Sequence, residues 1–323
     1  MRIRNLSKRL AGDPLSDAAR LARVVRSVKP DVVHSMTEQG CSLTLGSRRL
    51  LKGDFPPWIH SSWGSDIFYF GRQPEYEDQI RAALEACDYL MADCQRELEL
   101  APKFGFRGTI LGVFSAAGGF HIDEMKALCP WRPASERRII MVKGRQDHLG
   151  GRAIYVLQAL QMCKDKLSDY EIALYIPSEM IIHAAAYVSH LTGLRFRILP
   201  EHTPHDEMVP LMGRARVAIG NGMTDGTPHT MLEAMVMGAF PIQSNTADTR
   251  GWIEDGKNGI TVPPEDADAI AAAIAKALSD DAMVDEAAEI NAQITKERID
   301  ISIVKPKVVR IYKEIAEGTP ISV

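Results

Sequence analysis

Short apolar runs alternate with longer amphipathic segments along most of the chain. In the second half the sequence predicts strands over Ile139–Val142, Ile172–Ile176, Phe196–Leu199, Val217–Ile219, Phe240–Ile242 and Ile260–Val262. Apolar residues at helical spacing fill the intervals, as in Arg152–Lys164, in Glu179–Leu191 and in a helix after Pro264. Strands that alternate with helices indicate parallel sheets covered on both faces, and therefore an α/β protein.

The first part of the chain shows the same alternation less clearly. Asp13 would cap a helix that begins at Pro14 and leads into a buried strand ending at His34. Trp58–His60 and Tyr89–Ala92 are predicted as further strands, with a helix over Tyr76–Asp88. The glycines and prolines between Gly112 and Pro133 predict a connection between domains.

Composition narrows the class of protein. The chain is 46% hydrophobic and 25% charged, which excludes a disordered chain, and its net charge of −4 argues against a nucleic-acid binder. Its five cysteines form no C-x-x-C pair, which argues against a disulfide framework or a zinc site and fits a reducing compartment. Without a signal-like segment or an 18-residue apolar run, the expected location is the cytoplasm.

Positive charge is concentrated at the start of the chain. Residues 1–30 contain eight basic and two acidic residues, a local charge of +6. One interpretation is a basic helix that contacts the inner face of an anionic membrane. The other is an ordinary solvated helix face.

The stretch with the most chemical information follows the strand Val217–Ile219. Thr227 can cap a helix that has Pro228 as its first residue and ends at Gly238. The N–H groups of the first turn, around His229 and Thr230, would then form a site for a phosphate group.

Two acidic residues flank this helix start. Glu233 lies among apolar residues within the helix and needs polar partners, which the two hydroxyls of a ribose would supply. Asp225, in the loop before the helix, could accept hydrogen bonds from hydroxyls beyond the phosphates. The alternative is an ordinary helix start in which Glu233 pairs with a nearby base, and the residue pattern alone leaves both interpretations open.

Asp225-x7-Glu233, with the glycine- and proline-containing segments that follow up to Pro264, resembles the C-terminal domain of family-4 (group 1) retaining glycosyltransferases. The family motif is E-x7-E, and here Asp stands in the first place. The resemblance implies the GT-B fold, with two facing Rossmann-like domains. The second would bind a nucleotide sugar and the first a glycan, lipid-linked or small-molecule acceptor. It also implies that no metal ion is needed at the diphosphate.

The resemblance extends to the strand that opens the second domain. Arg145 matches an arginine that neutralises the diphosphate in the family, and Arg152 stands near the position of the family's lysine. The resemblance thus implies catalytic roles for Arg145, Arg152 and Asp225. The implied donor-binding residues are Lys143, Gly144, Gly226, Thr227, His229, Thr230 and Glu233.

In the first domain, Trp63-Gly64-Ser65-Asp66 resembles the family's H-G-S-D turn, with Trp in the place of His. Gly64 would allow the backbone to approach the sugar, and Asp66 would brace the turn. His34 and His60 are the nearest imidazoles, and each could equally be a structural residue at a strand end. These four residues are the candidates on the acceptor side.

The chain lacks the opening strands and the glycine-rich loop of the family, so we expect a shortened N-terminal domain. Three explanations stay open: the chain is truncated, a partner or second copy supplies the missing part, or the first domain is naturally small. We expect this incomplete domain over residues 1–120, a linker over 121–136, the donor domain over 137–300, and a C-terminal helix over 301–323 that returns toward the first domain.

The expected activity is hexosyl transfer from a nucleoside-diphosphate sugar to an acceptor hydroxyl with retention. The alternatives are a nucleotide-sugar epimerase of the same fold, or a nucleotide-sugar-binding subunit that needs a partner chain for activity.

Overall fold

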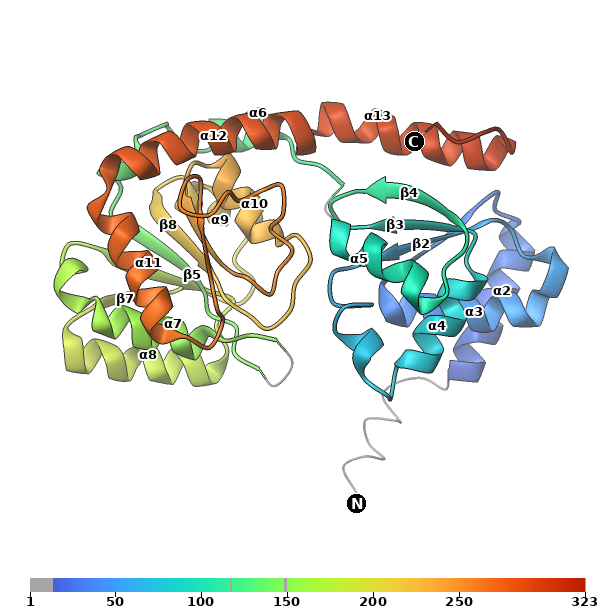
Figure 1. Cartoon of the computed structure of the whole chain (residues 1–323), viewed down its shortest axis with the longest axis horizontal. Helices are drawn as coiled ribbons and strands as arrows, with labels where there is room; N and C mark the ends of the chain where they lie inside the picture. Colours follow the sequence, from blue (N-terminus) through green and yellow to red (C-terminus); the bar gives the residue numbers. More distant parts are fainter. Residues whose placement is uncertain (1–13, 117, 148–149, 323) are drawn as a thin grey trace, which may run out of the picture. The chain divides into compact units, whose positions relative to one another are not determined.

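The computed structural model describes residues 14–116, 118–147 and 150–322, which divide into two units (Figure 1). Unit 1 consists of Met1–Ala116 and Pro306–Val323, and unit 2 consists of Ala117–Lys305. Each unit contains one parallel sheet with a core of its own, so the prediction of an α/β protein with two parallel sheets is confirmed.

The sheet of unit 1 has four strands that lie side by side in chain order. They are β1 (Val33–Met36), β2 (Trp58–Ser62), β3 (Tyr89–Ala92) and β4 (Thr109–Val113). Among the described residues up to 116, the α-helices are α2 (Pro14–Val28), α3 (Thr37–Leu51), α4 (Glu77–Ala86) and α5 (Gln95–Leu100). Because side chains alternate along a strand, Trp58 and Leu90 enter the core beneath α3 and α4, whereas Ile59 and Met91 face the opposite side.

That opposite side is covered by the end of the chain. α13 runs over Ile301–Glu317, and its part from Pro306 onward belongs to unit 1. Ile311 and Ile315 are buried against Ile59, Met91 and Leu111 of the sheet. The C-terminal helix expected over 301–323 is α13, which ends at Glu317.

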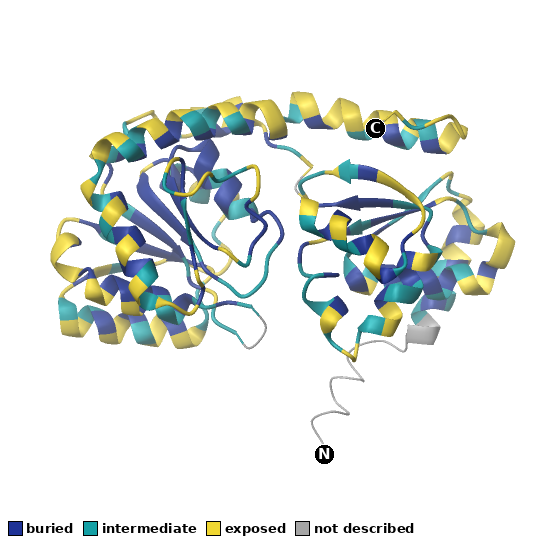
Figure 2. Ribbon diagram, in the orientation of Figure 1, coloured by how far each residue is buried: buried dark blue, intermediate teal, exposed yellow. Residues whose placement is uncertain are grey.

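The sheet of unit 2 has six parallel strands in the order β10-β9-β8-β5-β6-β7. They are β5 (Ile139–Lys143), β6 (Glu171–Tyr175), β7 (Arg195–Ile198), β8 (Ala215–Gly220), β9 (Phe240–Ser244) and β10 (Ile260–Val262). The α-helices that lie wholly in its described part are α6 (Ile122–Ala127), α7 (Ala153–Met162), α8 (Glu179–Thr192), α9 (His205–Met212), α10 (His229–Val236), α11 (Ala267–Ser279) and α12 (Asp281–Ile299). Figure 2 shows buried strands between helices whose outer faces are exposed.

The sequence analysis did not predict α3, β4 or α5, and the sequences of α3 and β4 explain why. α3 contains Gly40, Gly46 and several Ser and Thr residues, which have low helix propensity. Gly46 is needed there because a Cβ atom would lie 2.8 Å from the Cβ of Ala18 in α2. β4 falls partly within the segment expected to be a connection. It is an edge strand of which only Leu111 is buried, and Gly112 interrupts it with φ of +119°.

The segment 121–136, expected as a linker, forms α6 and a short 3-10 helix, and it buries Ile122, Met125 and Ala134 in unit 2. Asp13, the predicted cap of α2, lies outside the described residues, and Arg20, Arg23 and Arg26 of α2 are exposed. Within the described ranges, no helix is long and apolar enough to cross a membrane.

Candidate active site

The chain changes direction across the sheet of unit 2 between β5 and β8. From β5 the strands continue through β6 to β7 on one side, and β8 leads to β9 and β10 on the other. Ligands of open parallel sheets bind at the carboxyl ends of the strands at such a point. Lys143 ends β5 and Asp225 follows β8, and their Nζ and Oδ2 atoms are 3.7 Å apart. The sheet therefore brings together two of the predicted site residues.

The loop after β5 is fixed by backbone contacts. Gly144 donates its N–H to the carbonyl of Tyr175 and accepts one from Ser178, at 2.8 and 3.1 Å. A Cβ atom at Gly144 would lie 2.8 Å from the Cα of Pro177, so a larger residue does not fit there. Met223 donates to the carbonyl of Gly150 at 2.7 Å, which ties this loop to the loop after β8. Gly144 thus has a structural reason to be glycine.

Arg145 lies on this loop with a side chain that is 56% exposed. Its Nε donates to Asp147, whose other carboxylate oxygen accepts the N–H groups of Gly150 and Gly151. Partial burial of Asp147 acts to raise its pKa, but these N–H groups and Arg145 together lower the pKa to about 2. Asp147 is thereby kept as an anion, and the exposed guanidinium beside it is accessible to a ligand.

Arg152 occupies a different environment from the one expected. Its side chain is 18% exposed, and its Nε donates to Glu265 at 2.7 Å. Its Nη1 donates to the carbonyls of Asp147 and Gly151 at 3.1 and 2.9 Å. Through these bonds, the guanidinium of Arg152 holds the loop between β5 and α7 in place.

The helix predicted after β8 is α10, and its start differs by one residue from the prediction. Pro228, not Thr227, is the residue before the first turn, with φ of −64° and ψ of 124°, and no side chain caps the helix. The prediction of Thr227 as the cap is wrong, because Pro228 is extended and its carbonyl accepts the first helical N–H groups, those of Met231 and Leu232. The N–H groups of His229 and Thr230 belong to the first turn.

Side chains from several other parts of unit 2 surround this first turn. The side chain of Thr230 is hydrogen-bonded to the hydroxyl of Tyr175 at the end of β6, and burial raises the pKa of Tyr175. Burial lowers the pKa of His229, while the carboxylates of Glu233 and Asp225 act in the opposite sense and Lys143 lowers it further. The His229 ring packs edge-on against Phe120.

The two acidic candidates flank this helix start. Glu233 lies in the second turn of α10 with a side chain that is 13% exposed, and its Oε1 is 2.7 Å from Nε2 of His205 in α9. The N–H of Gly226 is 3.0 Å from Oδ1 of Asp225, and the carbonyl of Gly226 accepts the N–H of Asp248.

Sequence reasoning missed Tyr175 and His205. Tyr175 is an ordinary residue at the end of a buried strand, which gave no signal. For His205, the only signal was the open alternative that Glu233 pairs with a nearby base.

In unit 1, the two candidate histidines are held by hydrogen bonds. His34 contacts the hydroxyl of Tyr312 through Nδ1 and Ser61 Oγ through Nε2, the latter at 2.7 Å. His60 Nδ1 lies 3.1 Å from Ser35 Oγ. Burial lowers the pKa of His34 to about 4 and that of His60 to about 3. Both imidazoles are therefore neutral at pH 7.

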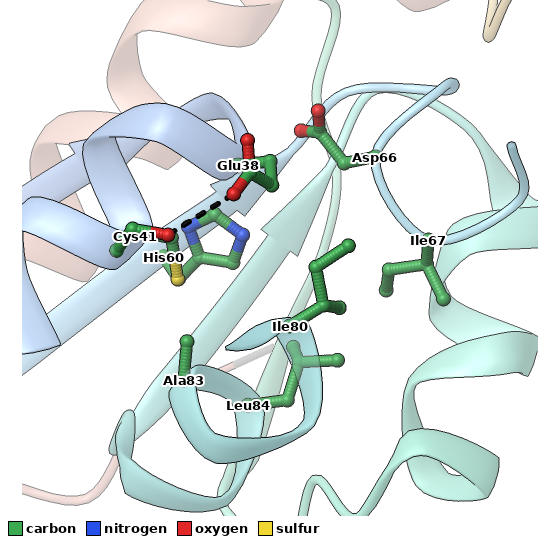
Figure 3. A pocket seen from close by; sticks show the side chains of 9 residues that line it. Glu38, Cys41, His60, Asp66, Ile67, Ile80, Ala83 and Leu84 are labelled. Atoms are coloured by element: carbon green, nitrogen blue, oxygen red, sulfur yellow. Dashed lines mark hydrogen bonds between the residues drawn. The ribbon is translucent and has the colours of Figure 1, made fainter. Parts of the chain in front are cut away.

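Asp66 stabilises the turn after β2. Its carboxylate accepts the N–H of Trp63 at 2.8 Å and also a backbone hydrogen bond from Glu38. Burial raises the pKa of Asp66 to about 7 despite these bonds. Figure 3 shows Asp66, Glu38, Cys41 and His60 among the residues that line a small pocket. Gly64, in the same turn, accepts a hydrogen bond from Arg96 at 3.0 Å through its carbonyl.

All five cysteines are free thiols. In the part of the chain that the structure describes, no group of three or more His, Cys, Asp or Glu side chains could hold a metal ion.

Two sequence families match the chain. The family described as "Glycosyl transferase 4-like" matches residues 1–94, and the family described as "Glycosyl transferases group 1" matches residues 195–296, which include Asp225 and Glu233. No curated protein matches the chain.

Solved structures similar to the chain include the HepE protein of Anabaena in complex with UDP, with a TM-score of 0.73 at 15% identity over 92% of this chain and 82% of that one. Sucrose-phosphate synthase from Thermosynechococcus elongatus has a TM-score of 0.74 at 14% identity, over 94% and 78% of the two chains. The UDP-forming α,α-trehalose-phosphate synthase from Burkholderia xenovorans has a TM-score of 0.74 at 13% identity, over 93% and 78%.

At these identities the structural similarity establishes the fold, and the family matches carry the assignment. One family matches the start of unit 1 and the other the half of unit 2 that contains α10. Together with the two parallel sheets of the GT-B fold, these matches identify the chain as a group 1 glycosyltransferase.

Proposed function

We propose that the protein transfers a hexosyl group from a nucleoside-diphosphate sugar to an acceptor hydroxyl with retention of configuration. The observation that carries this proposal is the arrangement at the carboxyl edge of β5 and β8. There, the first turn of α10, Lys143 and Glu233 combine an anion-binding helix start with a cation and a nearly buried carboxylate. The Anabaena HepE protein has been solved with UDP-glucose, which supports a uridine nucleotide as the first donor to test.

In this proposal the diphosphate lies against the N–H groups of His229 and Thr230, with Arg145 and Lys143 supplying positive charge. Negative charge grows on the diphosphate as the sugar departs, so groups already in place at this position stabilise the transition state more than the bound donor. Arg152 acts indirectly, because its bonds to Glu265 and to the loop carbonyls hold the loop that carries Arg145. The diphosphate is bound without a metal ion.

Glu233 would accept hydrogen bonds from the ribose hydroxyls, and Asp225, Gly226 and Thr227 would contact the hydroxyls of the donor sugar. The acceptor hydroxyl would attack from the face that the diphosphate leaves, so that no side-chain nucleophile is required. In unit 1, Gly64 and the exposed Trp63 are the proposed acceptor contacts. His34, His60 and Asp66 would have structural roles in unit 1, since each is held by hydrogen bonds to neighbouring residues.

The test is to incubate the full chain with UDP-, GDP- and ADP-sugars, with and without a set of glycan, lipid-linked and small-molecule acceptors. The measurements are nucleotide release and the anomeric configuration of the product by NMR. We expect one donor class to release its nucleotide slowly by hydrolysis alone, and faster with one acceptor, to which the sugar is transferred with retention. Isomerised sugar would instead show an epimerase, and nucleotide binding with turnover only after a second chain is added would show a binding subunit. Failure to bind any nucleotide would contradict the assignment of unit 2.

A further inference from the structure

The contact between His205 and Glu233 joins two helices that are distant in sequence. His205 is the first residue of α9, Glu233 lies in the second turn of α10, and the two helices pack against each other. Nε2 of His205 is 2.7 Å from Oε1 of Glu233. The side chain of His205 is 62% exposed, whereas that of Glu233 is 13% exposed. An exposed imidazole therefore contacts a carboxylate that is nearly buried.

This contact fixes the orientation of the carboxylate. A carboxylate only accepts hydrogen bonds, so Nε2 of His205 is the protonated ring nitrogen and donates the hydrogen bond to Oε1. Among the described residues, none donates a hydrogen bond to Oε2 of Glu233. The histidine thus restrains the side chain while leaving one oxygen, and a lone pair on the other, open to a ligand.

The position along α10 indicates which part of a nucleotide would meet that oxygen. Glu233 is four residues after His229, which corresponds to about 6 Å along the helix axis. A diphosphate held at the first turn therefore places its ribose, the next group of the nucleotide, beside Glu233. Two neighbouring hydroxyls can donate two hydrogen bonds to one carboxylate, whereas a base edge presents donors and acceptors together.

We propose that His205 is a positioning residue that orients Glu233 toward the 2′,3′-hydroxyl pair of the donor ribose. A carboxylate that is already oriented loses less conformational freedom when the ligand binds. The His205–Glu233 pair then selects ribonucleotides over 2′-deoxyribonucleotides. This inference rests on the proposed function, because it takes unit 2 as the nucleotide-binding unit.

The experiment is calorimetric titration of the full chain with UDP and with 2′-deoxy-UDP, and, where UDP does not bind, with GDP or ADP and the corresponding 2′-deoxy nucleotide. The variants are His205→Ala, His205→Gln, Glu233→Gln and the double variant His205→Ala/Glu233→Gln. His205→Gln keeps an amide N–H in the place of Nε2. His190→Ala, which removes an exposed histidine of α8, is the matched control. Circular dichroism and thermal unfolding verify that each variant is folded.

We expect His205→Ala to weaken UDP binding about 3- to 10-fold, as for the loss of one hydrogen bond, and to weaken 2′-deoxy-UDP binding less. His205→Gln should restore most of the affinity. In the Glu233→Gln background, His205→Ala should have no further effect, because the residue acts through the carboxylate.

Unchanged or tighter UDP binding by His205→Ala would overturn the proposal, and tighter binding would show that the imidazole competes with the ribose. An equal loss in both backgrounds would also overturn it, since His205 would then act independently of Glu233. If the unmodified chain binds none of UDP, GDP and ADP, the proposed function itself fails and this inference fails with it. Binding that persists while His205→Ala has no effect leaves the proposed function intact and removes only this inference.

Discussion

At the scale of single residues, the charged groups near the candidate site differ in how firmly they are held. Arg145 is exposed beside Asp147, whereas Arg152 is bound to Glu265 and to two backbone carbonyls. The sequence could not distinguish these two arginines, because the residues that bind Arg152 come from another loop and from the backbone. Predictions for the two therefore differ.

Arg145→Ala should lower turnover by about 100-fold, and it should weaken donor binding much less, because the charge that it stabilises grows in the transition state. The measurement is steady-state kinetics combined with calorimetric donor binding. An effect confined to donor binding would show that Arg145 only docks the diphosphate.

Arg152→Ala should act mainly on stability. Removing its guanidinium leaves two loop carbonyls and Glu265 without their donor, which costs about 1–3 kcal/mol of unfolding free energy. Urea unfolding of Arg152→Ala and Arg145→Ala, compared side by side, checks this difference. A stability loss equal in the two variants would contradict it.

The shifted pKa values of three titratable residues of unit 1 indicate how the free energy of unfolding depends on pH. The pKa values of His34 and His60 are lowered to about 4 and 3, so between these values and 6.5 the unfolded chain binds more protons and stability rises with pH. The pKa of Asp66 is raised from 3.8 to about 7, so the folded chain keeps a proton that the unfolded chain loses, and stability falls with pH over that range.

Asp66→Asn should therefore steepen the rise of stability between about pH 4.5 and 6.5, by at most about 1.4 kcal/mol per pH unit. Asparagine is neutral like the protonated acid and can still accept the N–H of Trp63. Urea unfolding across this range is the measurement, with Asp54→Asn at an exposed position as the control. A rise equal to that of the unmodified chain would show that Asp66 is already ionised in the folded protein over this range.

At the scale of elements, apolar runs located the central strands and the helix start after β8, because both depend on local pattern. They missed α3, whose glycines are explained by close packing on Ala18, and β4, an edge strand with little burial. They also assigned the cap of α10 to Thr227. The boundary of a helix depends on backbone angles at one or two residues, which sequence patterns define poorly.

The end of α13 provides a test of packing in unit 1. Ile311→Ala should lower the unfolding free energy by about 2–4 kcal/mol, because Ile311 is buried against Ile59, Met91 and Leu111. Val309→Ala, at an exposed position two residues earlier in the same helix, should change it by less than about 0.5 kcal/mol. Equal effects of the two substitutions in urea unfolding would contradict the packing of α13 on this sheet.

At the scale of the whole molecule, every proposed donor contact lies in unit 2, between Lys143 and Glu233. The sequence predicted this concentration because one continuous motif carries the helix start and both acids. It could not predict the contacts of Tyr175 and His205 with α10. These residues lie in β6 and α9, and only the order of the strands in the folded sheet brings them close to α10.

A nucleotide should therefore slow amide hydrogen exchange in α9, in α10 and in the loop after β8. Exchange in β1 to β4 of unit 1 should stay unchanged, because binding stabilises the segments that it contacts. Hydrogen-exchange mass spectrometry with and without UDP measures this pattern. Protection confined to unit 1 would contradict the assignment of the nucleotide site to unit 2.

In the proposed function, Glu233 binds the ribose of a nucleotide at the start of α10. Calorimetric titration of UDP into the full chain and into Glu233→Gln tests it most directly, with Glu207→Gln at an exposed position of α9 as the control. The substitution replaces charge-assisted hydrogen bonds with neutral ones. We predict a loss of about 1–3 kcal/mol in binding free energy for Glu233→Gln and none for Glu207→Gln. Equal UDP affinity of Glu233→Gln and the unmodified chain would contradict the claim.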